Sequence, residues 1–343
     1  MTVDCGLKTT FVPYLTFVKP RTPMNTNFTD YLLKITQATQ CQAIETIQSL
    51  WSGYGSIIRY RLEHALVDTV VVKFISLEPA SVHPRGWNTD NSHNRKVKSY
   101  QVETHWYEHW SQLCTNDCKV PKLIGSFAEG NQQWIVLEDL NLNFPLRKNQ
   151  LDLSEVKACL KWLANFHATF LNQKPTGLWE VGTYWHLATR PDEFTKIEHQ
   201  ALKAKAHLID ALLNQCKYQT LVHGDAKLAN FCFSEEGQRV AAVDFQYVGG
   251  GCGIKDVAYF FGSCLSSAEC ELYQDELLDF YFSQLGQALA DAKVDFGALE
   301  QEWRTMYPIA WTDFTRFLMG WMPTHQKLND YSIRLMNLVL ANL

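Results

Sequence analysis

Two carboxylates and one amide stand at a spacing that suits metal-assisted group transfer. Asn230 follows Asp225 by five residues, and Asp244 comes after the next expected hairpin. Transfer of a phosphoryl group needs one carboxylate at the accepting hydroxyl and, close by, hard oxygen ligands for Mg²⁺. The pattern therefore predicts Asp225 as the base and both Asn230 and Asp244 as metal ligands. A capped turn followed by an edge carboxylate is the structural alternative.

Four segments around these residues carry a family resemblance: 136–140, 221–225, 243–246 and 256–260. They resemble the small-molecule kinases that share the protein-kinase fold, namely aminoglycoside phosphotransferases, choline kinases and, most closely, the ecdysteroid-kinase-like proteins. In spacing and order the resemblance runs over roughly residues 50–325. It implies ATP- and Mg²⁺-dependent transfer of the γ-phosphate to a hydroxyl of a small acceptor: an amino alcohol, an aminoglycoside-like sugar or a sterol-like molecule. The first alternative is a nucleotide-binding or regulatory protein of the same fold that has lost catalytic activity. A protein kinase is the second and weaker alternative.

The resemblance also suggests roles for residues near the base. Lys227, two residues after Asp225, could neutralise charge on the transferring phosphoryl group, although most relatives carry another residue there. His223 is expected to pack and to hold the loop rather than to act as a base. Asp256, at the start of an expected helix, could hold the catalytic loop through backbone amides, or cap the helix.

Lys73 ends a β-branched run, where a kinase places the lysine that pairs with the α- and β-phosphates. Taken alone, a lysine at the end of a strand is usually a solvent-exposed residue at the edge of a sheet. Its acidic partner should lie on the next helix. Glu103 borders the apolar stripe of that helix and Glu108 lies almost opposite, so we expect Glu103 to pair with Lys73.

Further contacts with ATP are expected from a glycine turn and from the hinge. Gly53, Gly55 and Ser56 lie between two expected strands about 20 residues before Lys73, and resemble a loop that covers phosphates. A plain hairpin turn explains these residues nearly as well. At the hinge, the resemblance places Glu138 and Leu140 beside the nucleotide.

The spacing after Asp244 separates small-molecule kinases from protein kinases. Only residues 246–255 stand between the Asp244-Phe245 pair and Asp256, and four of them are glycines. No activation loop fits into this segment, and no Ala-Pro-Glu motif follows.

The chain has 11 Trp, 14 Tyr and 19 Phe, and many of them lie between Trp303 and Trp321. In the related kinases such C-terminal helices wall the acceptor pocket. Trp311, Asp313 and Trp321 could therefore bind a cation or stack on a sugar. Core packing is the equal alternative, because Trp at helical spacing is commonly buried. His167 is expected to be a buried structural histidine.

The expected fold that positions these residues is a bilobal α+β, protein-kinase-like architecture. Residues 1–140 should form a small, antiparallel β-rich nucleotide lobe with a helical N-terminal extension, and residues 141–343 a larger, mostly helical lobe. In the first lobe we expect short helices at 28–33 and 43–47, and strands around a glycine turn at 51–62.

A third strand is expected at 69–75, a helix at 96–113, and strands at 123–127 and 133–137. Residues 79–95 form a polar stretch that is either a lid or disordered.

In the second lobe, Ser154 should cap the first helix. One small β insertion is expected, in which 221–223 joins strands at 231–233 and 240–243. Helices should follow through residue 340.

Composition excludes several classes of protein. Of the 343 residues, 46% are hydrophobic and 20% charged, and the net charge is −5, so no basic field exists to hold a nucleic acid. Pro13 and Thr16 interrupt the apolar stretch 12–18, which is too short to act as a leader or a membrane span. We therefore expect a cytoplasmic monomer or homodimer with reduced cysteines.

Overall fold

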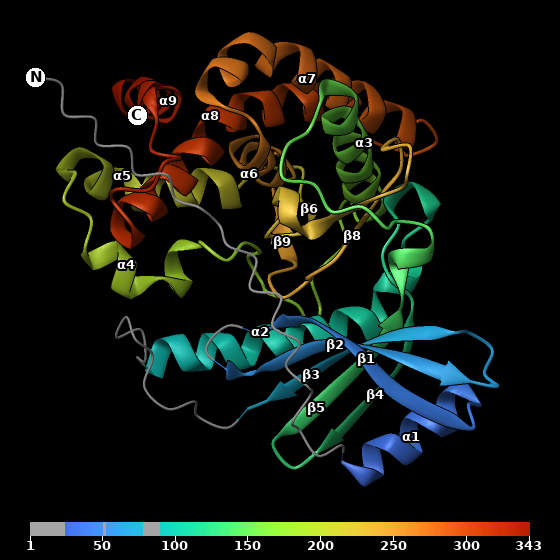
Figure 1. Ribbon diagram of the computed structural model, residues 1–343. Coiled ribbons are helices and arrows are strands. Elements are labelled where there is room, and N and C mark those ends of the chain that lie inside the picture. The colour runs from blue at the N-terminus through green and yellow to red at the C-terminus, as the bar shows by residue number, and fades with distance from the viewer. Residues whose placement is uncertain (1–24, 51–52, 78–89) are drawn as a thin grey trace, which may run out of the picture.

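The structure is a computed structural model that describes residues 25–50, 53–77 and 90–343. A five-stranded sheet with two helices forms one lobe, and a larger, mostly helical lobe lies above it in Figure 1. The expected bilobal α+β architecture is therefore confirmed. The proposed boundary near Leu140 stays a prediction.

All neighbouring strands of the five-stranded sheet are antiparallel. The strand order is β1-β2-β3-β5-β4. The bounds are β1 (Gln40–Ser49), β2 (Gly55–Glu63), β3 (Thr69–Ser76), β4 (Leu123–Glu129) and β5 (Gln132–Glu138). The strands expected at 69–75, 123–127 and 133–137 are all present.

Each face of this sheet packs against one helix. On one face, Val70 and Val72 of β3 join a core cluster with α1 (Thr26–Thr36). On the other face, Ile75 packs against α2 (Asp90–His109), and Lys73 points the same way because side chains alternate along a strand. A slip of one residue would move Lys73 into the apolar cluster with α1 and away from its acidic neighbours, so the register that aims Lys73 at α2 is strongly specified.

The expected helix at 43–47 is wrong, since these residues belong to β1. The pairing register with β2 shifts between Ala43 and Glu45 and again between Thr46 and Gln48. Two irregularities of this kind interrupt the two-residue alternation that identifies a strand in a sequence. The remaining apolar positions then happen to show a helical spacing.

Only the end of the polar stretch 79–95 lies within the described residues. Residues 90–95 are the first turns of α2, which ends at His109 rather than at Leu113. Residues 79–89, the rest of the expected lid, lie outside the described residues.

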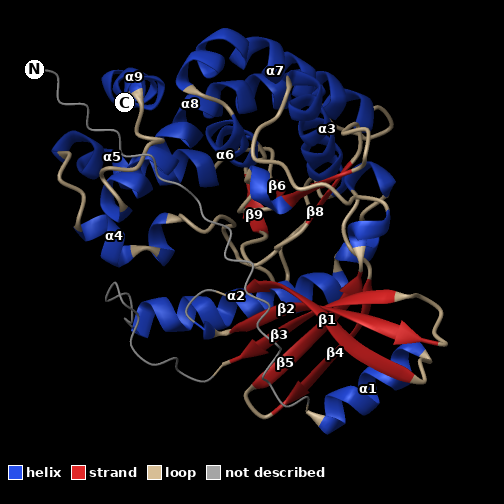
Figure 2. Cartoon of the chain, in the orientation of Figure 1, coloured by secondary structure: helices blue, strands red, loops and turns tan. Residues whose placement is uncertain are grey.

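The helical lobe surrounds four short strands, which Figure 2 shows on its side facing the large sheet. Its helices are α3 (Leu153–Thr169), α4 (Pro191–Thr195), α5 (Gln200–Asn214), α6 (Ile254–Cys264), α7 (Ser267–Ala288), α8 (Phe296–Trp321) and α9 (Asp330–Asn342). Asp152 caps α3 in a capping box with Glu155, so the expectation that Ser154 is the cap is wrong by two positions.

The short strands form two separate pairs rather than the single insertion that the sequence predicted. β6 (Thr220–Val222) pairs with β9 (Gly249–Gly251), and β7 (Phe231–Phe233) pairs with β8 (Val240–Ala242). The loop between β6 and β7 carries Asp225 and Asn230, and Asp244 follows β8. Both pairs therefore present their loops to the junction of the lobes.

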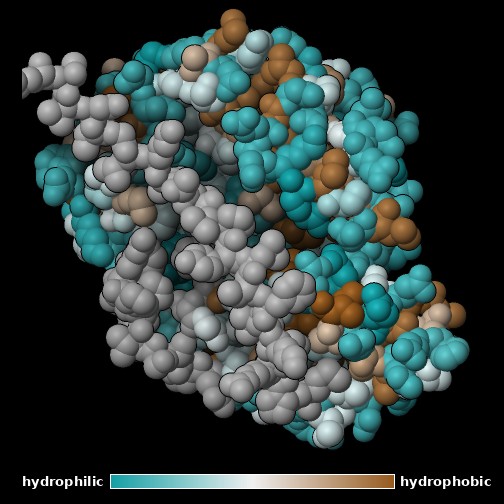
Figure 3. Space-filling view, in the orientation of Figure 1, coloured by the Kyte–Doolittle hydropathy of each residue, from teal (hydrophilic) through white to brown (hydrophobic). Residues whose placement is uncertain are grey.

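On the face drawn in Figure 3, hydrophilic residues spread over the helical lobe and hydrophobic residues form small patches between them. Within the described residues, no helix combines the length and the apolar character that a membrane crossing requires. No disulfide joins the cysteines of this part of the chain.

Candidate active site

Lys73 and Glu103 form the ion pair that the sequence predicted. The Lys73 ammonium lies 2.6 Å from Oε2 of Glu103, and both side chains are almost fully buried. Glu108, the rejected partner, instead accepts a hydrogen bond from Ser126 on the exposed side of α2. Burial raises the pKa of Glu103, and the charge of Lys73 counteracts this rise.

Asp244 completes a cluster with this ion pair. Its Oδ1 lies 3.8 Å from the Lys73 ammonium. Burial alone would raise the pKa of Asp244, but the charges of Lys73 and Lys227 outweigh it, so the pKa is lowered and the carboxylate is charged. Its backbone has φ 70°, a left-handed conformation that is unusual for a residue other than glycine.

Phe245 fixes the segment that carries Asp244. Its ring stacks on Trp106 of α2, with ring centroids 4.6 Å apart and an interplanar angle of 14°. Both side chains are buried. Helix α2 is therefore anchored to the helical lobe as well as to the sheet, one helical turn from Glu103.

The loop that carries Asp225 is attached to α6 by Asp256. The backbone N–H groups of His223 and Gly224 donate to the two oxygens of this buried carboxylate at 2.5 and 3.0 Å. His167 of α3 also lies 3.2 Å from Oδ2 and is fully buried, as a structural histidine should be. The expected backbone anchoring by Asp256 is present, but Gly253, not Asp256, occupies the cap position of α6.

Gly224 makes the tight turn of this loop. It has φ +78°, and an added Cβ would lie 2.1 Å from the carbonyl oxygen of Tyr247. Any side chain would therefore displace backbone at the residue before Asp225.

Both ring nitrogens of His223 are used within the loop. Nε2 donates to the Val243 carbonyl at 3.1 Å, and Nδ1 accepts from the backbone N–H of Asp225 at 3.2 Å. Burial lowers the pKa of His223, which keeps the ring neutral. These contacts agree with the expected structural role, because the ring connects Asp225 with Val243, the residue before Asp244.

Asp225 has two unlike oxygens. Oδ2 accepts from the Lys227 ammonium at 2.7 Å and from the Asn230 amide at 3.1 Å. Oδ1 accepts only a neutral donor, the hydroxyl of Tyr259 on α6, at 3.1 Å. Burial alone would lower the pKa of Lys227, but the charges of Asp225 and Asp244 outweigh it, so the pKa is raised and Lys227 stays charged.

Asn230 and Asp244 have the atoms that a divalent cation needs. The Asn230 amide nitrogen donates to the backbone carbonyl and to Oδ2 of Asp225, which leaves its amide oxygen for a cation. Oδ1 of Asp244 is buried and accepts no hydrogen bond. An orphaned, charged carboxylate oxygen fits Mg²⁺.

No group of three or more His, Cys, Asp and Glu side chains within the described ranges is arranged to hold a metal ion. Asn230 and Asp244 would therefore share the cation with oxygen ligands from outside the protein, such as phosphates and water.

The glycine turn lies at the end of the sheet next to Lys73. Gly55 has φ +142°, and an added Cβ would lie 2.0 Å from the carbonyl oxygen of Phe74. Gly53 has φ 75° and is exposed, and Ser56 is half-buried in β2. The side chain of Tyr54 folds back to α2, where its hydroxyl lies 2.6 Å from Nδ1 of His93. Contact of this turn with phosphates stays a prediction.

The hinge residues are engaged in structural contacts. The Glu138 carboxylate accepts from the Lys119 ammonium at 2.6 Å and from the Lys122 backbone at 3.0 Å. Leu140 is buried in a small cluster with β7 and β8. Contact of Glu138 and Leu140 with a nucleotide also stays a prediction, and for Glu138 it would rest on the main chain.

The glycine-rich segment before α6 is a strand packed against a loop. An added Cβ at Gly249 would lie 2.2 Å from the carbonyl oxygen of Trp179. Residues 246–253 therefore form only a short turn and β9 between Asp244 and α6. The structure has no activation loop at this position, as the spacing predicted.

The expected acceptor residues on α8 need correction. Trp311 is buried and donates to the Ser332 hydroxyl, and its ring packs on Tyr331. Asp313 is 1% exposed. Its oxygens accept from Arg316 and Trp185.

Trp311 and Asp313 are therefore core residues, and neither side chain is available for a cation. Trp321 is half-buried, and its ring stacks on Phe317. Contact of Trp321 with an acceptor stays a prediction.

Two residues near the base were missed in the sequence. Tyr259 was part of a recognised segment, but its hydroxyl was not assigned to Asp225. The ammonium of Lys327 lies 5.0 Å from the centre of the Tyr259 ring and 5.5 Å from that of Phe314. No motif surrounds Lys327, so only the folded chain reveals its position.

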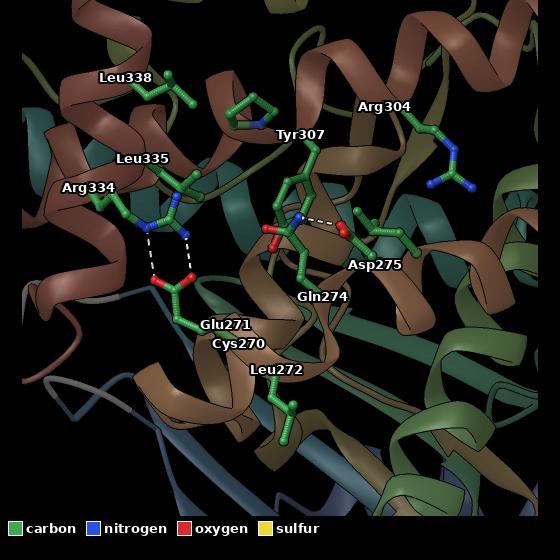
Figure 4. Close-up of a pocket in the computed structure, with 12 residues that line it drawn as sticks. Cys270, Glu271, Leu272, Gln274, Asp275, Arg304, Tyr307, Arg334, Leu335 and Leu338 are labelled. Carbon is green, nitrogen blue, oxygen red and sulfur yellow. Dashed lines mark hydrogen bonds and ion pairs between the residues drawn. The ribbon is translucent and has the colours of Figure 1, made fainter.

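A cavity of about 490 Å³ lies on the helical lobe between α7, α8 and α9, away from these residues (Figure 4). Figure 4 shows Arg334 paired with both oxygens of Glu271, at 2.8 and 2.7 Å. Gln274 donates to Asp275 at 2.8 Å. The candidate catalytic residues do not line this cavity.

A family comparison supports the site. Residues 180–294 match the model of the ecdysteroid kinase-like family. This segment covers about a third of the chain and contains Asp225, Asn230, Asp244 and Asp256. No curated protein matches the chain. The resemblance expected from the motifs is thus confirmed over this segment, and it supports small-molecule kinase activity.

Solved structures of small-molecule kinases align with most of the chain at low identity. For an amicoumacin kinase in complex with AMP-PNP, Ca²⁺ and Ami, the alignment covers 92% of both chains at 12% identity, with a TM-score of 0.48. For a putative fructosamine-3-kinase from Haemophilus somnus it covers 92% of this chain and 96% of the other at 11% identity, with a TM-score of 0.43. For an aminoglycoside phosphotransferase from Streptomyces rimosus, in complex with ADP and streptomycin, the alignment covers 83% of this chain and 98% of the other at 12% identity, with a TM-score of 0.43.

Proposed function

We propose that this protein is an ATP- and Mg²⁺-dependent phosphotransferase that transfers the γ-phosphate to a hydroxyl of a small molecule. The single observation that carries the proposal is the cluster of the buried Lys73–Glu103 pair with Asp244, whose buried Oδ1 atom has no hydrogen-bond donor. A charged, orphaned carboxylate oxygen beside a fixed ammonium suits a nucleotide with its metal.

Each side chain has a defined part in this reaction. Lys73, held by Glu103, binds the α- and β-phosphates. Asp225 takes the proton of the acceptor hydroxyl as the new oxygen–phosphorus bond forms and the bond to the ADP oxygen breaks. Lys227 neutralises charge on the phosphoryl group in transit.

Asn230 and Asp244 would hold the Mg²⁺ ion. When bound, this ion supplies positive charge to the phosphate oxygens. The amide nitrogen of Asn230 also keeps the base in place, because it donates to Asp225. One asparagine thus connects the metal site with the proton acceptor.

Release of ADP from ATP and Mg²⁺ tests the proposal, measured across alcohols, amino alcohols, aminoglycosides, sterols and hydroxy acids. We expect release with at least one acceptor and its loss in EDTA. Asp244→Asn should lower the rate by roughly 10²-fold or more, since it removes the charge that holds the metal. Asp291→Asn, at an exposed position, is the matched control.

The same experiment separates this proposal from its alternatives. If the protein binds nucleotide but releases no ADP with any of the acceptors, the result would favour a nucleotide-binding protein without catalytic activity. Phosphate incorporation into protein substrates alone would favour a protein kinase. A chain that binds no nucleotide would contradict all three functions.

A further inference from the structure

The ammonium of Lys327 is connected to Asp225 through one aromatic residue, Tyr259. Lys227 and Asn230 occupy Oδ2 of Asp225, whereas the Tyr259 hydroxyl occupies Oδ1. Lys327 lies against the ring of the same tyrosine. A single tyrosine therefore separates this ammonium from Oδ1, the oxygen of Asp225 whose donor is neutral.

Lys327 has aromatic neighbours but no acidic partner. Tyr259 and Phe314 lie 5.0 and 5.5 Å from its ammonium, measured to their ring centres. Within residues 25–50, 53–77 and 90–343, no carboxylate lies at ion-pair distance from it. A partly buried cation without a counter-ion is favourable for binding an anion.

Asp313 of α8 is already neutralised by an ion pair. Both Asp313 and Arg316 are essentially unexposed, and they neutralise each other at 2.8 Å. Arg190, on the same side of the lobe, stacks on Tyr184 and Phe317 and pairs with Glu193. Of the charged side chains described on this wall, Asp313, Arg316 and Arg190 are thus ion-paired, whereas Lys327 has no ion-pair partner.

We propose that Lys327 selects acceptors that carry an anionic group, such as a carboxylate, near the hydroxyl that is phosphorylated. This inference rests on the proposed function and adds the substrate class. The acceptor body would lie against the half-buried ring of Tyr184, which packs edge to face on Tyr259 at 5.6 Å and on Phe314 at 6.5 Å. The reaction is unchanged: the acceptor oxygen binds the γ-phosphorus, ADP leaves, and the proton passes to Asp225.

Matched acceptors on two scaffolds test the inference. We would compare gluconate with gluconamide and glucamine, and a bile acid with its primary amide and the corresponding amine. For each compound, ADP release gives kcat/KM, and the thermal shift in the presence of AMP-PNP and Mg²⁺ gives binding without turnover. On at least one scaffold the acid should exceed its amide by about 10-fold, and the amine should rank last.

Three variants assign this preference to Lys327. Lys327→Gln should reduce the ratio of acid to amide to about 1, and Lys327→Glu should reverse the order in favour of the amine. Lys293→Gln is the matched control, because this exposed lysine precedes α8, whose 26 residues span roughly 39 Å before Lys327 is reached. The control should keep the ratio of the unchanged protein.

The outcomes for the inference and for the proposed function are distinct. If ATP is turned over but amides or amines are preferred, or if Lys327→Gln keeps the preference for acids, the inference is overturned and the phosphotransferase stands. If AMP-PNP with Mg²⁺ gives no thermal shift, the proposed function fails. If AMP-PNP binds and acids shift the protein without turnover, Lys327 still selects the anion, and only the transfer step is contradicted.

Discussion

Tyr259 donates a hydrogen bond of 3.1 Å from its hydroxyl to Oδ1 of Asp225. The other oxygen of this carboxylate accepts from an ammonium and an amide, and is therefore the less basic of the two. Oδ1 is thus the atom on which we expect the acceptor proton to arrive. The asymmetry comes from two elements, since Lys227 belongs to the catalytic loop and Tyr259 to α6.

Replacing Asp225 by Asn should separate catalysis from binding. Asp225→Asn keeps the shape of the side chain but removes the proton acceptor, so kcat should fall by about 10²- to 10⁴-fold. The thermal shift given by AMP-PNP with Mg²⁺ should remain, because Lys73, Asn230 and Asp244 are intact. Turnover at the rate of an Asp291→Asn control would reject Asp225 as the base.

The Lys73–Glu103 pair should behave as one unit in a double-mutant cycle. Removing one partner leaves the other buried without its opposite charge, which costs about 3–5 kcal/mol, whereas removing both can be nearly neutral. Lys73→Met and Glu103→Gln should each lower the free energy of unfolding by more than the double variant does. Additive losses in urea unfolding would show that the two groups are independent.

Substitution by alanine should lower stability more at Gly55 than at Gly130. Both have positive φ, but a Cβ at Gly55 meets the Phe74 carbonyl at 2.0 Å, and at Gly130 it has no neighbour within 4 Å. Gly130→Ala should cost about 1 kcal/mol from backbone strain alone. Gly55→Ala should cost more and should also weaken AMP-PNP binding, since it moves the turn over Lys73. Equal effects of both variants on stability and binding would contradict this placement.

Lys327 should lower stability at neutral pH. The pKa of Lys327 is lowered to about 8, mainly by burial. The positive charge of Lys227 also lowers this pKa, whereas Asp225 and Cys264 act in the opposite direction. An unfolded lysine has a pKa near 10.5, so between pH 8 and 10.5 the unfolded chain binds more protons and stability rises with pH.

The charged groups that act on this lysine are Asp225 and Lys227 of the catalytic loop, with Cys264 of α6 and His325 of its own segment. Lys327→Met should therefore raise the melting temperature below pH 8, by an amount that corresponds to at most roughly 3 kcal/mol. The gain should shrink towards pH 10.5. A gain that is the same at pH 7 and pH 10 would show that the ammonium is not desolvated.

The chemistry-bearing loop was predictable because its information is local. Asp225 and Asn230 share one loop, and Asp244 follows the adjoining hairpin, so their spacing along the chain nearly determines their spacing in space. The alternation of side chains along a strand similarly predicted the face on which Lys73 lies, and the helical wheel predicted Glu103 as its partner. Their contact at 2.6 Å required only that α2 cover the expected face of the sheet.

Features that depend on distant segments were not predictable in this way. Two register shifts concealed β1, since alternation is the signal that identifies a strand. Asp313 was assigned to the acceptor although Arg316, three residues later on the same helix, was a visible sign of neutralisation. Lys327 meets Tyr259 only through the packing of α6 and α8, and no spacing in the sequence encodes that contact.

The stack of Trp106 on Phe245 has a consequence for regulation. It positions α2, and with it Glu103, through a contact between two buried aromatic rings. In a phosphotransferase of this design, the segment between Asp244 and α6 is too short to act as an activation loop that moves α2. Flux through such an enzyme would follow the supply of acceptor and nucleotide, and control would lie in the amount of protein made.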